Sequence, residues 1–363
     1  MSIIVDNYNY GRYLAAAIDS ALAQTHTPTE VIVVDDGSTD GSAGIIRAYG
    51  ERVRAVFKAN GGQASALNAG FAASRGGIVL FLDADDVLQP EAAERMAQAF
   101  LAPGTVRAHC RMDLIDADGR RTGGQKPAPH LPLLSGDLRR EVLAFPDDLP
   151  WLPTSGNAFA AETLRRIMPI PEAAYRILAD YYLSHVTPLF GRVAAVEAMS
   201  ASYRVHGANS YARDGAPLDL AQVRRTIEYW AETHRHIVKF AEALGLPGRP
   251  RTPEDLLSVA FVANRMVSRR LEAARHPIAG DSPARLLRLG WRAAARRFNA
   301  SLPFKMLFLA WLSAMAIAPR AVAYSLAVMF LEPEARRGLN RWLGRQRHTG
   351  ARPPERHVDS ADA

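Results

Sequence analysis

The sequence predicts an α/β fold in which a largely parallel sheet is covered by helices and followed by a region that is helical only. Over the first 105 residues, short β-branched runs alternate with stretches whose apolar residues recur at helical spacing, which is typical of strand–helix–strand units. Acidic clusters directly follow two of these runs, at the carboxyl ends of strands where such folds bind ligands. With 363 residues, the chain is long enough for two or more structural units.

Each element of the first 105 residues follows from its local pattern. Strands are expected where short apolar or β-branched runs occur, because a strand covered on both faces is apolar on both faces. Helices are expected where apolar residues recur every three or four positions. The resulting order is strand 2–5, helix 13–23, strand 30–34, helix 40–49, strand 53–57, helix 64–74, strand 78–82 and helix 90–101.

The pattern changes from residue 106 onward. Two runs flank Asp118-Gly119, a dipeptide typical of hairpin turns. The proline-rich, irregular stretch 126–153 is typical of lids and substrate loops. The elements expected here are strands at 106–115, 120–123, 156–160 and 194–203, and helices that begin at 162 and 177.

Beyond residue 217 only helices are expected. Amphipathic helices at 220–244 and 253–275 are each followed by glycine or proline, which end helices. The segment 302–331 is apolar except for Lys305, Pro319 and Arg320. We therefore expect four regions: an α/β domain at 1–210 with halves 1–105 and 106–210, a helical region at 211–280, a basic apolar region at 281–347 and a disordered tail at 348–363.

Composition excludes several classes of protein. A hydrophobic content of 48% excludes a chain that is disordered throughout. The single cysteine, Cys110, excludes a disulfide framework and a zinc site of several thiolates, and we interpret Cys110 and His109 as parts of a core strand. No basic segment precedes an apolar run at the start of the chain, so we expect a cytoplasmic protein without a secretory signal.

The positive charge is concentrated at one end of the chain. Residues 285–347 contain twelve Lys or Arg and two Glu, while the whole chain carries a net charge of +7. This distribution argues against a nucleic-acid partner, whose footprint would spread over the fold, and indicates a local anionic partner.

The same end contains two apolar runs, 306–318 and 321–331, separated by Pro319-Arg320. Neither run reaches the ~20 residues that span a bilayer, and an arginine at the bilayer centre is costly. We therefore expect a pair of short helices on an anionic membrane surface, peripheral on the inner face of the plasma membrane. The alternative is a buried helical hairpin.

Two carboxylates in the pattern Asp83-Ala84-Asp85 follow an apolar strand. Side chains at i and i+2 of an extended segment point the same way, and two such carboxylates repel each other unless a cation lies between them. Mg²⁺ or Mn²⁺ bridging to a diphosphate fits this oxygen-rich arrangement. Asp116-Ala117-Asp118 has the same spelling but falls at the expected hairpin turn, so we assign it no metal.

A second acidic pair, Asp35-Asp36, follows the strand at 30–34. Thr39 or Asp40 can cap the next helix, but a cap does not account for carboxylates at the strand end. A carboxylate there can accept a hydrogen bond from the N–H of a nucleobase.

Together these motifs resemble the family 2 glycosyltransferases. The resemblance is specific over about residues 2–105, at 2–9, 33–40, 60–62, 68–70 and 82–86, and weaker at 153–157, 179–182 and 203–207. It implies a GT-A fold, a Rossmann-like mixed sheet with helices on both faces, in which 1–105 binds the donor and 106–210 the acceptor. It also implies inverting transfer from a nucleotide-diphosphate sugar to a carbohydrate or lipid-linked acceptor, in cell-surface polysaccharide or glycolipid synthesis.

By position, the resemblance implies roles for individual residues. Donor-binding residues would be Tyr8, Asp35, Asp36, Asn60, Gly61, Gly62 and Asp83. Asp85 would be a metal ligand, joined by His206, and Asp180 would be the general base. Acceptor contacts are implied for Thr154, Ser155, Gly156 and Asn157. Two positions differ from the family pattern: Asp6-Asn7 replaces its usual Pro-Thr, and Ala179 replaces the usual Glu before the base.

The chemistry that these residues permit is a single displacement. Asp180 would take a proton from an acceptor hydroxyl, which attacks the anomeric carbon opposite the nucleotide. Two alternatives stay open: a degenerate domain that only binds sugars or nucleotides at a membrane, and a sugar nucleotidyltransferase. The latter class normally carries a basic, glycine-rich loop after the first strand, where this chain has only Gly11 and Arg12.

Overall fold

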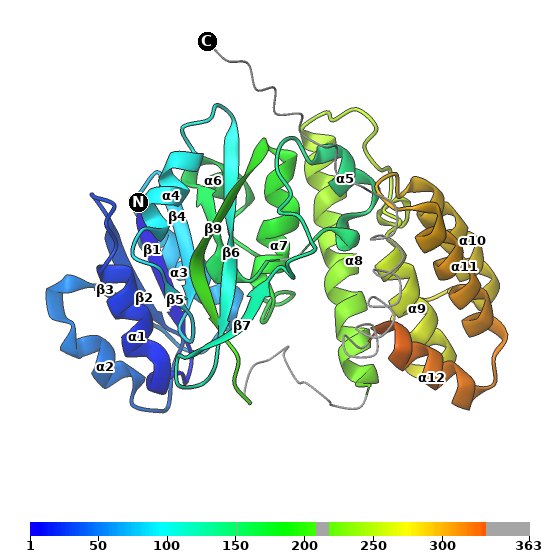
Figure 1. The fold of residues 1–363 in the computed structure, drawn as a ribbon, viewed down its shortest axis with the longest axis horizontal. Coiled ribbons are helices and arrows are strands. Elements are labelled where there is room, and N and C mark those ends of the chain that lie inside the picture. Colours follow the sequence, from blue (N-terminus) through cyan, green and yellow to red (C-terminus); the bar gives the residue numbers. More distant parts are fainter. Residues whose placement is uncertain (151, 208–217, 332–363) are drawn as a thin grey trace, which may run out of the picture.

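The computed structural model describes residues 1–150, 152–207 and 218–331 (Figure 1). Their strands form a nine-stranded sheet in the order β3-β2-β1-β4-β8-β6-β9-β5, with β7 paired to β6. The helices α8 to α12 form a second body beside the sheet (Figure 1). The predicted α/β fold with a helical C-terminal region is confirmed. The predicted tail at 348–363 and part of the predicted basic region lie outside the described residues.

The first four strands are parallel, as their alternation with helices predicts. They are β1 (Ser2–Asn7), β2 (Glu30–Asp35), β3 (Arg54–Phe57) and β4 (Ile78–Asp83). In this half of the sheet Ile4 lies opposite both Ile32 and Phe81. All four carboxyl ends therefore lie at one edge of the sheet, and the acidic residues that follow them meet there.

Alternate residues of β1 pack on opposite faces of the sheet. Ile3 and Val5 belong to the core beneath α1 (Gly11–Leu22), α2 (Ser42–Ala48) and α4 (Ala92–Ala99). Ile4 belongs to the core beneath α3 (Gln63–Ala73), α6 (Ala161–Ile167) and α7 (Ala179–Val186). A Cβ at Gly70 of α3 would lie 2.3 Å from Ile4 Cγ2, so only glycine allows this close packing of helix on strand.

The second half of the sheet is mixed. It contains β5 (Val87–Leu88), β6 (Thr105–Ile115), β7 (Arg121–Lys126), β8 (Asn157–Ala160) and β9 (Arg192–Arg204). The strand β8 lies antiparallel between β4 and β6, whereas β9 runs parallel to β6. Cys110 is buried in β6, which confirms the core-strand interpretation. The stretch predicted to be irregular contains a helix, α5 (Arg139–Ala144).

The C-terminal helices share one apolar core. They are α8 (Leu220–Ala243), α9 (Val259–Leu271), α10 (Pro283–Arg296), α11 (Leu302–Ile317) and α12 (Arg320–Leu331). Met266 of α9, Leu286 of α10 and Leu312 of α11 all lie in this core. The boundary predicted near residue 280 therefore falls inside one packed unit, because local composition does not reveal which helices share a core.

The helix predicted at 253–275 begins later, at Val259. Its first N–H groups are held by a distant residue: the Asp148 carboxylate accepts from the N–H of Val259 and of Ala260, each at 2.9 Å. Such groups have no partner within the helix, so a carboxylate stabilises the helix start. The cap comes from more than 100 residues away, which explains why the local sequence misplaced the start.

Candidate active site

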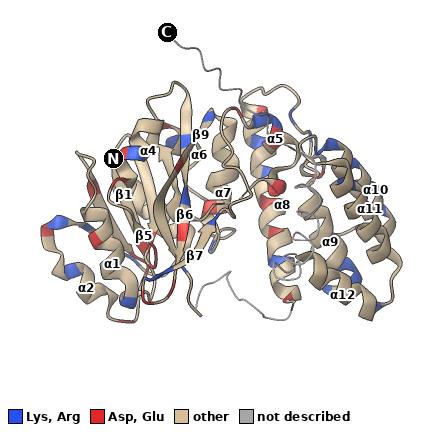
Figure 2. Ribbon diagram, in the orientation of Figure 1, with Lys and Arg blue, Asp and Glu red and all other residues tan. Residues whose placement is uncertain are grey.

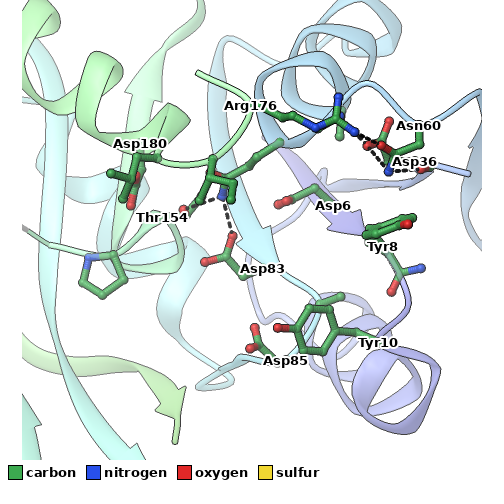
Figure 3. A pocket seen from close by; sticks show the side chains of 18 of the residues that line it. Asp6, Tyr8, Tyr10, Asp36, Asn60, Asp83, Asp85, Thr154, Arg176 and Asp180 are labelled. Carbon is green, nitrogen blue, oxygen red and sulfur yellow. Dashed lines mark hydrogen bonds between the residues drawn. The ribbon is translucent and has the colours of Figure 1, made fainter. Parts of the chain in front are cut away.

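A cavity of about 360 Å³ opens at the carboxyl ends of β1, β2 and β4 (Figure 3). Its lining contains one cationic side chain, Arg176. Its acidic lining residues come from five separate positions in the chain: Asp6, Asp36, Asp83, Asp85 and Asp180. In Figure 3, Asp180 and Thr154 lie at one end of the cavity and Tyr8 and Asp36 at the other, with Asp6 and Asp83 between them.

Burial and mutual repulsion perturb the central carboxylates. Burial, followed by the charge of Asp85, raises the pKa of Asp6 to about 8. Burial, followed by the charges of Asp6 and Asp86, raises the pKa of Asp83 well above its usual value. Asp6 Oδ1 is buried and has no hydrogen-bond partner among the described residues. A cation or additional hydrogen-bond donors in the cavity would therefore stabilise the ionised form of these carboxylates.

Asp85, predicted to be a metal ligand, lies beside His206. His206 Nε2 is 3.0 Å from Asp85 Oδ2, and the imidazole packs between the rings of Tyr10 and Tyr13, with centroids 5.6 and 5.0 Å away. No cluster of three or more His, Cys, Asp or Glu fit to hold a metal occurs within the described residues. The Asp85 carboxylate is nevertheless a ligand that Mn²⁺ or Mg²⁺ accepts when oxygens of a phosphate or of water complete the coordination.

Asp86, to which the sequence analysis assigned no role, holds the backbone around this site in place through buried hydrogen bonds. Ser155 Oγ donates to Asp86 Oδ2 at 2.7 Å, and the backbone N–H of Arg204 donates to Asp86 Oδ1 at 2.9 Å. The backbone N–H of Asp83 in turn donates to Ser155 Oγ at 3.1 Å. This buried network joins the end of β4 to the end of β9 and so fixes the position of the Asp83–Asp85 segment.

Asp36 is held by a loop that wraps around its carboxylate. Lys58 Nζ donates to Asp36 Oδ1 at 2.6 Å, and the N–H groups of Gly61 and Gly62 donate at 2.9 and 2.7 Å. Gly62 has φ +89°, and a Cβ there would lie 2.6 Å from the backbone oxygen of Arg176, so the loop requires glycine. The Arg176 guanidinium donates to Asn60 Oδ1. Three of the predicted donor residues, Tyr8, Asp36 and Asn60, therefore lie together at one end of the cavity (Figure 3).

Gln63 connects the two ends of the cavity. Its amide Nε2 donates to Asp83 Oδ1 at 3.2 Å and to Thr154 Oγ1 at 3.3 Å. Its Oε1 accepts from the backbone N–H of Ala179 at 3.0 Å. That N–H belongs to the first residue of α7, so Gln63 fixes the start of the helix that carries Asp180.

Asp180 lies in the first turn of α7 and is 5% exposed. Burial raises the pKa of Asp180 to about 7, against the lowering effect of hydrogen bonds from the Tyr181 N–H and from Thr154. Its Oδ1 is buried and has no hydrogen-bond partner among the described residues. A carboxylate with a pKa near 7 and an unengaged oxygen is suited to take a proton at neutral pH.

Some predicted site residues do not line the cavity. Asp35 is buried and accepts from Asn7 Nδ2 at 2.9 Å. Of the predicted acceptor contacts, Thr154 lines the cavity, whereas Ser155, Gly156 and Asn157 are buried inside the fold. Asn157 Oδ1 accepts from the buried Arg107 at 2.6 Å. The acceptor role predicted for these three residues does not fit this placement, because all three are enclosed by protein.

The second Asp-x-Asp sequence forms a turn, as expected. Asp116 Oδ1 accepts from the N–H groups of Asp118 and Arg120, each at 2.9 Å, between β6 and β7. The same Asp-x-Asp pattern therefore contributes carboxylates to the cavity at 83–85 and forms a turn at 116–118.

The sequence analysis missed Lys58, Gln63, Asp86 and Arg176. Asp86 is a third acidic residue next to the predicted pair. Nothing in the local pattern indicated that its carboxylate is buried and hydrogen-bonded and not solvated. Lys58 and Arg176 approach Asp36 and Asn60 from other loops, at sequence separations of 22 and 116. No local periodicity could have indicated those contacts.

The chain resembles known proteins over the part that carries the cavity. Residues 2–152 match the family described as glycosyl transferase family 2. Over 215 residues it is 39% identical to an uncharacterized glycosyltransferase of Nostoc sp., a stretch that covers 58% of this chain and 66% of that relative. Over 109 residues it is 41% identical to chondroitin synthase of Pasteurella multocida, covering 29% of this chain and 11% of the synthase. The chain thus covers less than two thirds of either relative.

The fold extends the similarity to the helical region. The crystal structure of S. aureus TarS 1–349 in complex with UDP-GlcNAc superposes with a TM-score of 0.53 at 17% sequence identity, over 93% of this chain and 91% of that one. A longer chain of S. aureus TarS gives the same TM-score over 91% of this chain and 55% of that one. The expected GT-A type of fold is therefore confirmed.

Proposed function

The chain belongs to glycosyl transferase family 2, and we propose that it transfers a sugar from a nucleotide-diphosphate donor to an acceptor hydroxyl with inversion at the anomeric carbon. The observation that carries this proposal is the position of Asp180, which lies across a cavity of carboxylates from Tyr8 and Asp36 (Figure 3). A donor laid between these ends would place its sugar toward Asp180 and its base toward Tyr8.

Asp180 acts on the acceptor in this scheme. Its unengaged oxygen accepts the proton of the attacking hydroxyl, which forms a bond to the anomeric carbon as the bond to the diphosphate breaks. A single displacement of this kind inverts the anomeric centre and needs no second carboxylate as nucleophile. Gln63 holds the start of α7 at a fixed position relative to Asp83, and so fixes the distance between Asp180 and the donor.

The charge of the cavity favours a divalent cation as a partner of the donor. A diphosphate would be repelled by those carboxylates of the cavity that are ionised, and Arg176 is the one cationic side chain in its described lining. We propose that Asp85 and His206 hold Mn²⁺ or Mg²⁺, with Asp83 toward the ribose or the metal. When bound, the cation supplies neutralisation of the charge that grows on the departing diphosphate.

The donor end is arranged for a nucleoside. Tyr8 is 46% exposed at the cavity, which leaves its ring available for stacking on a base. Asp36, which follows β2, lies beside Tyr8 and is held by the loop that carries Lys58 and Asn60 (Figure 3). The acceptor is a carbohydrate or lipid-linked hydroxyl compound in cell-surface polysaccharide or glycolipid synthesis, a class supported by the stretch shared with chondroitin synthase.

A donor screen tests the proposed activity. The full chain is incubated with Mn²⁺, a panel of carbohydrate and lipid-linked acceptors and, one at a time, UDP-, GDP- and dTDP-sugars, starting with UDP-GlcNAc, the donor held by the similarly folded TarS. We expect one donor to release its nucleoside diphosphate with turnover. Donor binding without turnover would support the binding-module alternative, and synthesis of a nucleotide sugar from a sugar phosphate would support the nucleotidyltransferase.

We also propose that α10 to α12 attach the enzyme to an anionic membrane surface. Of the fifteen exposed large apolar side chains among the described residues, ten lie between Trp291 and Met329. Residues 283–331 contain seven Lys or Arg and no Asp or Glu (Figure 2). No described helix is both long and apolar enough to cross a bilayer. An apolar face flanked by cations suits attachment within the interface of a bilayer.

The segment 302–331 was interpreted either as helices on a membrane surface or as a buried helical hairpin. Each interpretation applies to one face of α11. Phe308, Leu312 and Met315 are buried in the helical core, as the hairpin interpretation predicts. Leu302 and Ile317 are 71% and 85% exposed on the other side. A helix that is apolar on both faces buries one of them in protein and leaves the other without a partner in the described structure.

Removal of that exposed apolar surface should release the protein from vesicles. We expect the full chain to co-sediment with anionic vesicles and to be released only in part by high salt, since apolar insertion is insensitive to salt. Leu302→Ser with Ile317→Ser should lower the bound fraction several-fold. Leu101→Ser, at a site 82% exposed on the α/β domain, is the matched control and should bind as wild type. Equal sedimentation of all three proteins would contradict the attachment.

A further inference from the structure

Lys126 is a half-buried cation near the active site that the proposed mechanism does not use. It ends β7, where it lies opposite Met112 of β6. Its ammonium nitrogen lies 3.7 Å from the centroid of the Tyr203 ring, and Tyr203 lines the acidic cavity together with Asp180. In the described structure Lys126 does not line the cavity itself, so it contacts the cavity wall through Tyr203.

The ring of Tyr203 holds the ammonium group without neutralising it. The face of an aromatic ring attracts a cation through its quadrupole but carries no net charge. No described residue forms an ion pair or a hydrogen bond with this ammonium group. The positive charge of Lys126 therefore acts on ionisable groups that lie beyond the ring contact.

The charge of Lys126 reaches the proposed base. Burial raises the pKa of Asp180 to about 7, and hydrogen bonds from the Tyr181 N–H and from Thr154, followed by the charge of Lys126, oppose this rise. Burial also lowers the pKa of Lys126, and the charges of Asp86 and Asp180 oppose that change. An opposite charge favours the ionised form of a buried group, so Lys126 and Asp180 stabilise each other in their charged forms.

The other groups around Asp180 do not replace Lys126. The titratable groups on which the charge of Asp180 also acts are Asp6 of β1, Asp83 of β4, Arg107 of β6 and Tyr203 of β9. The two carboxylates oppose ionisation of Asp180, whereas Arg107 favours it. Arg107 also has a structural role, because it donates to Asn157 Oδ1 at 2.6 Å and to the Ser184 backbone oxygen at 2.8 Å. The contribution of Lys126 can be tested without breaking such contacts.

We propose that Lys126 is a positioning residue for sugar transfer: its ammonium group, held over Tyr203, stabilises the ionised form of Asp180 and so keeps the base able to accept a proton at neutral pH. This inference rests on the proposed role of Asp180 as general base. Without Lys126, a carboxylate buried among other acids would be protonated over a wider range of pH. Less of the enzyme would then carry the base in its active form.

The pH dependence of kcat tests this role. Lys126→Gln and Lys126→Met both remove the charge, and methionine keeps an apolar contact with the ring. In both variants the fall of kcat on the acid side should begin at higher pH, with several-fold less activity than wild type at pH 6.5 and nearly wild-type activity at pH 8.5. The KM for the donor should change little, because Lys126 does not line the described cavity. Lys126→Arg keeps a cation that stacks on aromatic rings and should retain the wild-type profile.

Arg121→Gln is the matched control on the same strand. Arg121 is exposed and pairs with Asp113 at 2.7 Å, so the substitution removes a positive charge from β7 without removing one from beside Tyr203. Its pH profile should match wild type. Unshifted profiles in both neutral Lys126 variants would overturn the proposal. An equal shift in Arg121→Gln would also overturn it, by assigning the effect to net charge.

A measurement that needs no turnover separates this pairing from the proposed function. In a double-mutant cycle of chemical unfolding, Lys126→Gln should lower stability more in the wild type than in Asp180→Asn at pH 8.5, where Asp180 is ionised. At pH 5 the two losses should become equal, because Asp180, whose pKa is about 7, is protonated. Equal losses at both pH values would overturn the pairing. Absence of transfer from every donor, with the coupling present at pH 8.5, would contradict the proposed function and support the pairing alone.

Discussion

Asp180→Asn is expected to abolish sugar transfer while leaving donor binding nearly unchanged. The substitution keeps the size of the side chain but replaces the basic carboxylate with an amide, which cannot take up the proton of the hydroxyl. General base catalysis contributes roughly 10²–10⁴-fold, so kcat should fall by on the order of a thousandfold with little change in donor affinity. Released nucleoside diphosphate gives the rate, and calorimetry with the nucleoside diphosphate and Mn²⁺ gives the affinity.

The same residue predicts how the rate depends on pH. Because the pKa of Asp180 is raised to about 7, the base is protonated below that pH, and the rate should fall about tenfold per pH unit on the acid side. The measurement uses saturating donor and Mn²⁺, so that weaker binding of either one at low pH does not determine how the rate depends on pH. A rate that stays flat down to pH 5 would contradict the assignment of Asp180 as the base.

Stability gives the control for this variant. A carboxylate whose pKa is raised by folding favours the folded state when protonated, and this contribution is lost as pH rises from about 4 through about 7. At pH 8 the ionised Asp180 therefore destabilises the protein, and Asp180→Asn should unfold at the same or a higher temperature. An inactive variant that also unfolded early would indicate a structural role.

Asp85→Asn is expected to lower turnover by a comparable amount through loss of the cation. A bound metal ion contributes several kcal/mol to the stabilisation of a departing phosphate, which corresponds to about a thousandfold or more in rate. Unlike Asp180→Asn, this variant should also lose Mn²⁺-dependent binding of the nucleoside diphosphate. Calorimetry with and without Mn²⁺ measures both effects.

The chain provides a matched control for Asp85→Asn. Asp118 ends the second Asp-x-Asp sequence but lies in an exposed turn, where it pairs with Arg120 at 2.9 Å. Asp118→Asn should therefore keep full activity and full response to Mn²⁺. Wild-type turnover that persisted in excess chelator would overturn the cation assignment, whatever the variants did.

Local sequence patterns were sufficient for the parallel strands and for the acidic residues that follow them. Asp83 and Asp85 could be assigned to a cavity because they follow a buried strand at a spacing of two, and the β/α order brings the ends of such strands to one edge. In the structure His206 Nε2 lies 3.0 Å from Asp85 Oδ2, and the metal-binding role that the family resemblance implies for both residues stays a prediction.

The contacts that complete the cavity come from residues far apart in the sequence. Gln63 joins Asp83 to the start of α7 across separations of 20 and 116 residues, and Ser155 serves Asp86 from inside the fold rather than an acceptor from the cavity. The two faces of α11 differ in burial, although both are apolar in sequence. In each case the tertiary structure decided the outcome.

What the sequence determined by itself was the parallel strands of the first half and the edge of the sheet at which the carboxylates meet, because periodicity and strand order are local properties of the chain. What only the tertiary structure decided was which side chains are buried, paired or left facing a cavity. The acidic cavity illustrates the difference, since its carboxylates come from residues near 6, 36, 84 and 180. Charge repulsion and burial act through space, and only packing determines which distant residues come within their range.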